Sequence, residues 1–184
     1  MGKKKHILKE NTILVLGEYD TFVADLCEHW SNLPYCELSV IASALRALAA
    51  IHQSHHWQAS GDPSYGDHLL YDRLYYASNE HVDQVAEKAV GLGGEDLVCP
   101  VKLSEQTFSF VQQACSCNTN GIYMASEIAL TSFEAEKHFL NLLSKCIDSL
   151  RASQMMTNGI ENMLQGIADI HESHVYLLGQ RTKH

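Results

Sequence analysis

The chain has 184 residues, a formal net charge of −9 and 46% apolar residues, a composition typical of one compact domain. A chain of this length needs no disulfide or structural metal to hold a core, and no apolar run approaches the roughly 18 residues of a membrane span. There is no secretory signal, so we expect a cytoplasmic protein whose six cysteines are reduced, namely Cys27, Cys36, Cys99, Cys115, Cys117 and Cys146.

The first eleven residues differ from the rest of the chain in charge. Lysines crowd this segment, at Lys3, Lys4, Lys5 and Lys9, and we expect residues 1–11 to form a flexible basic arm. A basic arm on an acidic body suggests binding to a polyanion. A solvated terminus without a function is the alternative.

The spacing of apolar residues predicts four long helices, at Glu37–Trp57, Gly66–Leu92, Ile122–Ser153 and Ile160–Leu178. A short helix or entry segment precedes them at Thr12–Trp30, and another short helix is expected at Ser104–Ala114 in the long connection. This pattern predicts an all-α, four-helix bundle over residues 12–178, with a crossover between the second and third long helices. Residues 179–184 are expected to be a polar tail.

Two pairs of candidate metal ligands lie on the second long helix. His68 and Asp72 are four residues apart, as are Asp83 and Glu87, so the members of each pair project from the same side of the helix. At about 100° per residue, all four positions fall within a sector roughly 100° wide. Such a stripe is costly unless a cation neutralises it, and its nitrogen and oxygen donors suit iron, zinc or manganese. His56, at the end of the preceding helix, is a further candidate ligand.

The length of the helix separates the two pairs. Their centres, near residues 70 and 85, are about 22 Å apart along a straight helix, whereas a metal–ligand bond is about 2 Å long. One chain therefore cannot bring both pairs to a single ion. Two copies packed antiparallel about a two-fold axis can do so, which predicts a site between subunits and at least a dimer.

The alternative is a solvated helix face without a metal. In that case Asp72, Asp83 and Glu87 pair with neighbouring basic residues, and His68 caps or packs. Spacing alone leaves both interpretations open.

Three further groups contain residue types that bind metals. Cys115 and Cys117 form the only close cysteine pair, and they lack the second pair that a zinc site needs. The other two groups are expected to lie at a helix end and in an exposed charged turn, with a metal site as the alternative for each: His52 and His55, and Glu134, Glu136 and His138.

The stretch from His56 to Gly94 resembles the signature of the Dps family (DNA-binding proteins from starved cells), a branch of the ferritin-like superfamily. The resemblance rests on His56-Trp57, Gly61, Tyr65, His68, Asp72, His81-Val82-Asp83, Ala86-Glu87 and Leu92-Gly93-Gly94. It covers this stretch without a gap. The segment from Gly94 to Ile122 has no counterpart that we can place in the family.

The resemblance implies a dodecameric hollow shell with ferroxidase sites shared across two-fold axes. The ligands implied are His56, His68 and Asp72 of one chain, with Asp83 and Glu87 of its mate. The implied chemistry is oxidation of ferrous iron, typically with hydrogen peroxide, followed by storage of ferric mineral; zinc is an alternative occupant. The indole of Trp57, beside a ligand, would supply an electron or quench a radical, with packing in a core or interface as the alternative.

DNA binding is the rival function. Some family members hold DNA with a lysine-rich N-terminal arm, and Lys3, Lys4, Lys5 and Lys9 match that arm in kind. On this interpretation the protein compacts DNA at the nucleoid, and its metal site is structural or vestigial. A helical interaction module without metal is a third interpretation.

Overall fold

The computed structural model describes residues 26–28, 30, 33–62, 64–115 and 125–183. Within these ranges the regular structure is entirely helical, as predicted. The elements are α2 (Cys36–Gln58), α3 (Ser64–Gly93), the short 3-10 helix η1 (Glu95–Val98), α4 (Pro100–Ala114), α5 (Ala125–Ala152) and α6 (Asn158–Arg181). The basic arm with its four lysines, most of the predicted entry segment at residues 12–30, and Cys117 lie outside the described residues.

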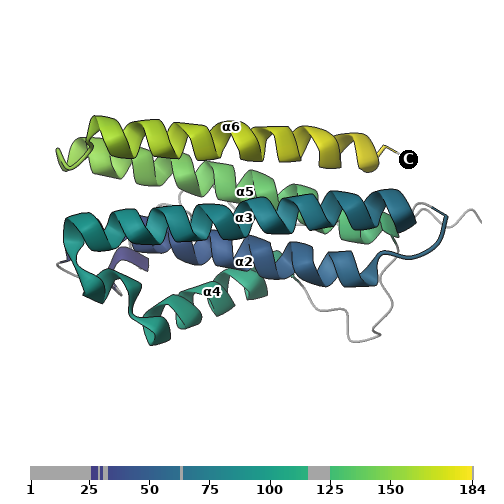
Figure 1. Ribbon diagram of the computed structural model, residues 1–184, viewed down its shortest axis with the longest axis horizontal. Coiled ribbons are helices and arrows are strands. Elements are labelled where there is room, and N and C mark those ends of the chain that lie inside the picture. Colours follow the sequence, from purple (N-terminus) through teal and green to yellow (C-terminus); the bar gives the residue numbers. More distant parts are fainter. Residues whose placement is uncertain (1–25, 29, 31–32, 63, 116–124, 184) are drawn as a thin grey trace, which may run out of the picture.

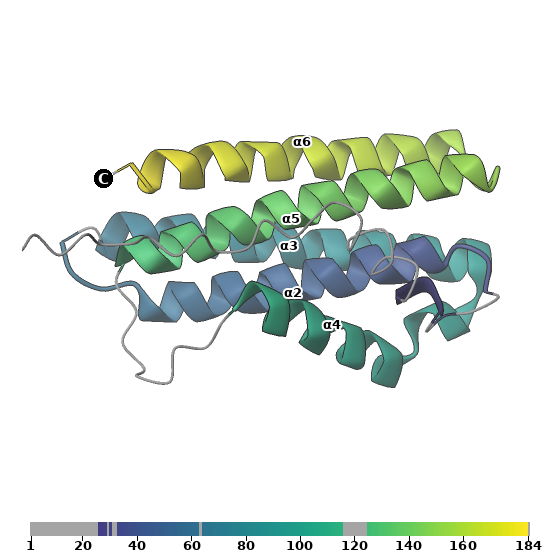
Figure 2. The same ribbon diagram turned by 180° about the vertical axis from the view of Figure 1, so that it is seen from behind.

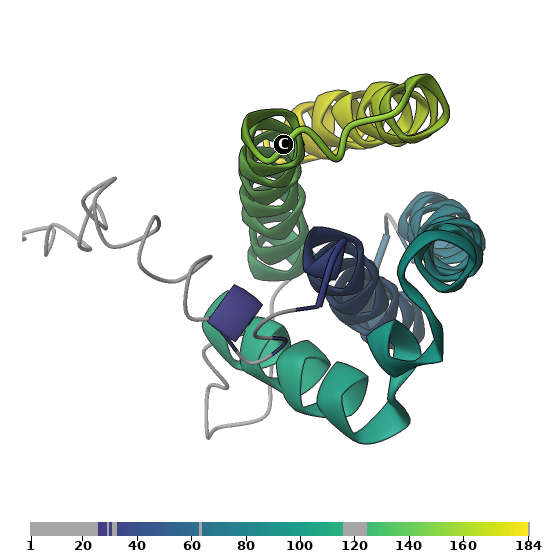
Figure 3. The ribbon, with the colours of Figure 1, turned by 90° about the vertical axis from the view of Figure 1, so that its left-hand side faces the viewer.

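The four long helices form two antiparallel hairpins. α2 pairs with α3 and α5 pairs with α6, and the two hairpins meet mainly where α2 packs against α5 (Figure 1). The shorter α4 packs against α2 from outside, on the side away from α6 (Figures 2 and 3). This is the predicted four-helix bundle with a connection running along one side. None of the described helices combines the length and apolarity needed to cross a lipid bilayer.

α2 is the central element of the bundle. Its sequence is rich in alanine and leucine, which favour helix, and three neighbouring helices cover it, so it is buried on most of its surface. Even polar residues of α2 are buried, among them Ser39, Ser43 and His52. Ser39 and Ser43 each direct the hydroxyl proton to a carbonyl oxygen, of Leu97 and of Ser39 respectively, which satisfies them inside the core.

The helix ends differ slightly from the prediction. α4 begins at Pro100, earlier than expected, because proline suits the first turn of a helix. α6 begins after Thr157, whose hydroxyl oxygen accepts a hydrogen bond from the Ile160 backbone N–H at 3.2 Å. α6 also continues to Arg181, into the predicted tail. There the Arg181 guanidinium binds the buried carboxylate of Asp67 through two hydrogen bonds, of 2.7 and 2.9 Å.

The apolar core of the bundle has two parts. The larger cluster contains Leu38, Leu45, Phe139 and Leu164, and a small cluster near the other end contains Tyr71, Leu74, Ile128 and Leu178. Buried or half-buried polar side chains lie near the boundary between the two clusters on α3, α5 and α6, and just after the larger cluster on α2. They are His52 and His55 on α2, Ser78 and His81 on α3, Ser132 and Glu136 on α5, and His171 and His174 on α6. A polar layer therefore crosses the centre of the bundle.

Candidate functional site

Two of the predicted ligands, His56 and His68, lie together where α2 ends and α3 begins. Their rings stack with centroids 3.6 Å apart and planes inclined by 26°. The Nδ1 atom of each ring is 3.0 Å from the backbone carbonyl oxygen of the other residue. Because a carbonyl oxygen only accepts hydrogen bonds, both Nδ1 atoms carry the proton. In the neutral rings both Nε2 atoms therefore keep a lone pair, which is the form in which histidine binds metals.

Asp72 completes this group one helical turn after His68. Its Oδ1 atom is 4.0 Å from His56 Nδ1, and the carboxylate is partly exposed. The hairpin between α2 and α3 thus brings together His56, His68 and Asp72, three of the five predicted ligands. Two ring nitrogens and a carboxylate are donor types that transition-metal ions accept.

Asp83 and Glu87 lie further along α3, and both are exposed. Since they are on the same straight helix as His68, a single chain does not bring them to the first group. Instead they continue the same outer face of α3. Three large exposed side chains share this sector at about 100° per residue: Tyr65, Leu69 and Tyr76, which are 78%, 52% and 60% exposed. The outer face of α3 is therefore both apolar and rich in candidate ligands.

Trp57 follows His56 and is 71% exposed. Its indole is therefore not packed in the core of the chain. Of the two packing roles expected for Trp57, core or interface, only packing at an interface between chains remains.

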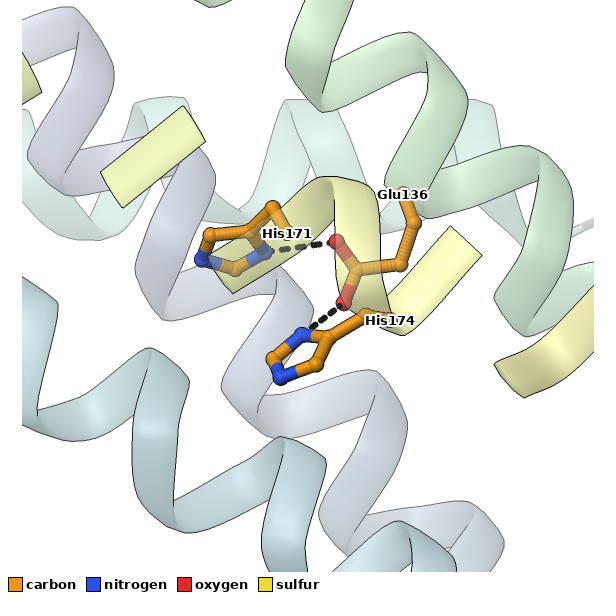
Figure 4. A group of neighbouring side chains, drawn as sticks. All are labelled: Glu136, His171 and His174. Carbon is orange, nitrogen blue, oxygen red and sulfur yellow. Dashed lines mark hydrogen bonds and ion pairs between the residues drawn. The ribbon is translucent and has the colours of Figure 1, made fainter. Parts of the chain in front are cut away.

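A second group of ionisable residues lies inside the polar layer, centred on Glu136 of α5. This carboxylate is fully buried and accepts three hydrogen bonds from imidazoles. His52 Nε2 and His174 Nδ1 donate to Oε1 at 2.9 and 3.1 Å, and His171 Nδ1 donates to Oε2 at 2.6 Å. Figure 4 shows the two α6 histidines approaching the carboxylate from one side of the bundle. Side chains of two helices, α2 and α6, therefore converge on a single carboxylate of α5.

Further polar groups extend this buried network. His171 donates from Nδ1, so its Nε2 accepts from His81 Nδ1 of α3, 3.1 Å away. His52 donates from Nε2, so its Nδ1 faces the Ser132 hydroxyl at 3.4 Å, and Ser132 Oγ in turn accepts from His55 Nδ1 at 2.6 Å. All four bundle helices contribute to one hydrogen-bonded network.

The electrostatics favour an ionised Glu136 carboxylate and disfavour protonation of His174, His55 and His81. Burial raises the pKa of Glu136, but hydrogen bonds and charges from His171, His174 and His52 outweigh burial and hold it well below its usual range. Burial lowers the pKa of His174, although Glu136 opposes this. Burial followed by repulsion from neighbouring histidines lowers the pKa of His55 and of His81 to about 4.

The sequence did not predict this buried group. We predicted an exposed charged turn at Glu134, Glu136 and His138, which is wrong for Glu136: it lies about 200° around the helix from Glu134 and faces the core, whereas the other two lie on the outer side. His52 and His55 do lie near the end of α2, as predicted, but both are buried and hydrogen-bonded to α5, which the sequence did not indicate. The signal available in the sequence was two pairs of histidines spaced i, i+3 on helix faces that are otherwise apolar, His52 with His55 and His171 with His174.

No family model matches the chain. In sequence it is similar to two proteins called nutrient stress-induced DNA-binding protein. The one from a Synechococcus strain is 25% identical over 151 residues, covering 79% of this chain and 78% of the relative. The one from a Nostoc strain is 27% identical over 108 residues, covering 59% of this chain and 55% of the relative.

Solved structures of several Dps proteins have the same fold as this chain. The Dps of Thermosynechococcus elongatus has a TM-score of 0.67 at 12% identity, covering 86% of this chain and 93% of that one. DpsC of Streptomyces coelicolor has a TM-score of 0.67 at 20% identity, covering 82% and 88%. The Dps of Microbacterium arborescens in the high iron form has a TM-score of 0.66 at 16% identity, covering 88% and 95%.

Proposed function

The chain is a relative of the Dps proteins in both sequence and fold, and from this premise we propose that it is a Dps-like mini-ferritin. It oxidises ferrous iron at a site shared by two chains and stores the ferric product inside a dodecameric shell. The observation that carries the proposal is the pairing of His56 with His68. Each ring uses its Nδ1 proton on the other's carbonyl oxygen, so both Nε2 lone pairs are available beside Asp72.

The second half of the site comes from another chain. Asp83 and Glu87 lie on the same face of α3 as the first group but about 22 Å along the helix. A two-fold axis near the middle of that face brings the pairs of two chains together, and it does so twice per dimer. In this arrangement a cation neutralises every carboxylate of the stripe, so no two unneutralised carboxylates face each other across the interface.

The exposed side chains of α3 support this mode of assembly. Tyr65, Leu69 and Tyr76 are more than half exposed in the single chain and lie in the sector of the ligands. Large apolar side chains grouped on one helix face are typical of surfaces that pack against a partner. A second copy of the chain is the partner whose own face carries matching apolar residues.

The residues have separate roles in the proposed oxidation. The imidazoles of His56 and His68 hold ferrous iron as substrate, and the carboxylates of Asp72, Asp83 and Glu87 favour the ferric product because hard oxygen donors stabilise the higher charge. Each ferrous ion loses one electron. Hydrogen peroxide accepts two electrons and two protons and leaves as two water molecules. Trp57, exposed beside His56, supplies an electron or quenches a radical; zinc competes with iron for the same donors.

Mixing two defective chains tests the shared site. A His68→Ala chain and an Asp83→Ala chain each lose rapid ferrous oxidation when alone, followed by ferric absorbance after peroxide addition. Co-expressed chains pair at random, and each mixed pair regains one of its two sites. About one quarter of the wild-type rapid phase should therefore return. A site contained in one chain would restore nothing on mixing, which would contradict the proposal, as would a purely monomeric protein in native mass spectrometry.

DNA binding is the second candidate function. Two relatives are called DNA-binding proteins, and the N-terminal lysines of this chain (Lys3, Lys4, Lys5 and Lys9) would carry the interaction. Phosphate contacts from many copies of the arm give binding that weakens steeply with salt. In a gel-shift assay at low salt, deletion of residues 1–9 should abolish the shift. An unchanged shift after deletion would show that the arm does not carry DNA binding.

A further inference from the structure

The buried group around Glu136 has no part in the proposed intersubunit site. It lies in the centre of the bundle, whereas His56, His68 and Asp72 lie at the junction of α2 and α3. Three imidazoles donate to one carboxylate that is entirely shielded from solvent. Placing an ion here costs several kcal/mol of desolvation, a cost that an apolar core would avoid.

The charge balance of the group calls for a cation. In the described part of the chain, every ion-pair partner of Glu136 is a histidine, and no lysine or arginine neutralises it. With neutral rings the group carries one buried negative charge. Either an added proton or a metal ion balances that charge.

Two observations favour a metal ion. First, ligand atoms of Glu136, His171 and His174 all lie within 4.8 Å of one another, close enough for a shared ion after small side-chain shifts. Second, the Nε2 atom of His174 is buried and has no hydrogen-bond partner. A ring nitrogen left without a hydrogen-bond partner at such depth costs free energy. A metal ion bound to one nitrogen of this ring leaves the proton on the other, so the ring no longer keeps an unpartnered lone pair.

We propose that this cluster is a second metal site, complete within one chain, that binds one divalent transition-metal ion through Glu136, His171 and His174. His52, which also contacts the Glu136 carboxylate, is the candidate fourth ligand. Imidazole-rich sites with one carboxylate suit zinc, iron(II), cobalt or copper rather than magnesium or calcium. A ring that binds the ion through one nitrogen keeps its proton on the other, so no ligand needs a charge that it does not already carry.

The geometry requires only modest expansion. Ligand atoms of a tetrahedral zinc site lie about 3.3 Å apart, given bonds of about 2.0 Å, and the present nitrogen–oxygen distances are 2.6 to 3.1 Å. The carboxylate–ring distances would lengthen by a few tenths of an ångström, while the ring nitrogens of His171 and His174, which lie within 4.8 Å of each other, would close on the same ion. Glu136 lies on α5 and the two histidines lie on α6, so the ion would also link these two helices.

Metal uptake in the absence of the surface site tests the proposal. The His68→Ala/Asp83→Ala chain, stripped with a chelator, is dialysed against zinc or cobalt(II) alone, and bound metal is measured by elemental mass spectrometry. We expect one ion per chain and a cobalt spectrum of tetrahedral intensity. Adding His171→Ala and His174→Ala should lower metal affinity roughly tenfold or more. Adding His138→Ala, an outer-face histidine of α5, should not.

Two controls keep the outcomes distinct. Helicity and oligomer mass show whether the His171→Ala/His174→Ala chain still folds, and Glu136→Gln, which preserves shape while removing the charge, is a second variant for the same measurement. No bound ion in the stripped background chain would overturn the proposal. So would equal binding by a folded chain that lacks both α6 histidines. This experiment measures bound metal and not ferrous oxidation, so it tests the inner metal site independently of the proposed intersubunit ferroxidase site.

Discussion

His56 and His68 lie face to face and each donates its Nδ1 proton to the backbone carbonyl oxygen of the other. This reciprocal arrangement fixes the tautomer of both rings with backbone carbonyl oxygens, so no carboxylate is needed to orient them. It also ties the last turn of α2 to the first turns of α3, so the position of the rings does not depend on a bound ion. Both rings are thus prepared for metal binding by the backbone of a single hairpin.

Replacing His68 by phenylalanine should separate stacking from metal binding. The Phe ring can still stack on His56, while Nε2 and one hydrogen bond, worth about 1 kcal/mol, are lost. We expect the chain to keep its helicity and mass, while ferrous oxidation loses its rapid phase and metal affinity falls roughly tenfold or more. Stopped-flow absorbance and metal titration measure these effects. His138→Phe on α5 is the matched control, and a rapid phase that survives in His68→Phe would contradict the assignment.

The apolar residues on the outer face of α3 should control pairing of chains. Leu69→Glu/Tyr76→Glu places two carboxylates where a partner's like face would pack, and burying unpaired charge is costly. Native mass spectrometry should show loss of the two-fold pair, and rapid iron oxidation should disappear with it. Tyr176→Glu, a similarly exposed aromatic of α6, should keep the pair. If the double variant still forms pairs, another surface mediates them.

The ion pair between Asp67 and Arg181 should contribute strongly to stability. Asp67 is buried and receives both guanidinium hydrogen bonds, so Asp67→Asn leaves the half-buried Arg181 cation without its partner. We expect the free energy of unfolding to fall by about 3 kcal/mol, measured by urea denaturation. Asp148→Asn breaks an exposed pair with Arg151 and should change it by less than about 1 kcal/mol. In Arg181→Met, adding Asp67→Asn should cost much less than in wild type.

The thiol of Cys146 should resist alkylation. Burial, and then the charge of Glu37, raises its pKa far above the usual range of a cysteine. The reactive thiolate therefore stays scarce even at pH 9, whereas an ordinary thiol ionises near pH 8.5. Iodoacetamide labelling of the folded protein, read by peptide mass spectrometry from pH 7 to 9, should modify the half-buried Cys99 well before Cys146. Equal labelling would show that the α5 core opens readily.

Much of the fold could be predicted from periodicity. The apolar spacing of α2 and α3 fixes their helical state, and the long connection predicts a crossover because adjacent antiparallel helices need only a short loop. Helix ends were less predictable. Arg181 remains helical because it reaches Asp67 on another helix, and a partner 114 residues away in sequence leaves no local signal.

The outer and inner candidate sites differ in predictability for a physical reason. Positions 68, 72, 83 and 87 share one face by helix geometry alone, so their grouping needs no tertiary information. Glu136 and His171 meet only because α5 and α6 turn particular faces toward each other. Flanked by Glu134 and Lys137, Glu136 looks like part of a solvated surface. Only the packing of four helices shows that its carboxylate is buried.

α3 lies between the outer candidate site and the buried group around Glu136, and its opposite faces are turned to each. His81 contacts His171 in the interior, while Asp83, two residues later, is exposed on the outer face. A helix is only roughly 10 Å across, so the outer candidate site and the buried group lie within about one helix diameter of each other. Inserting one residue between His68 and His81 would rotate the downstream half by about 100°. It would displace Asp83 and Glu87 on the outer face together with His81, the hydrogen-bond partner of His171 in the interior. Connecting loops can change length freely, whereas the register of α3 is constrained twice over.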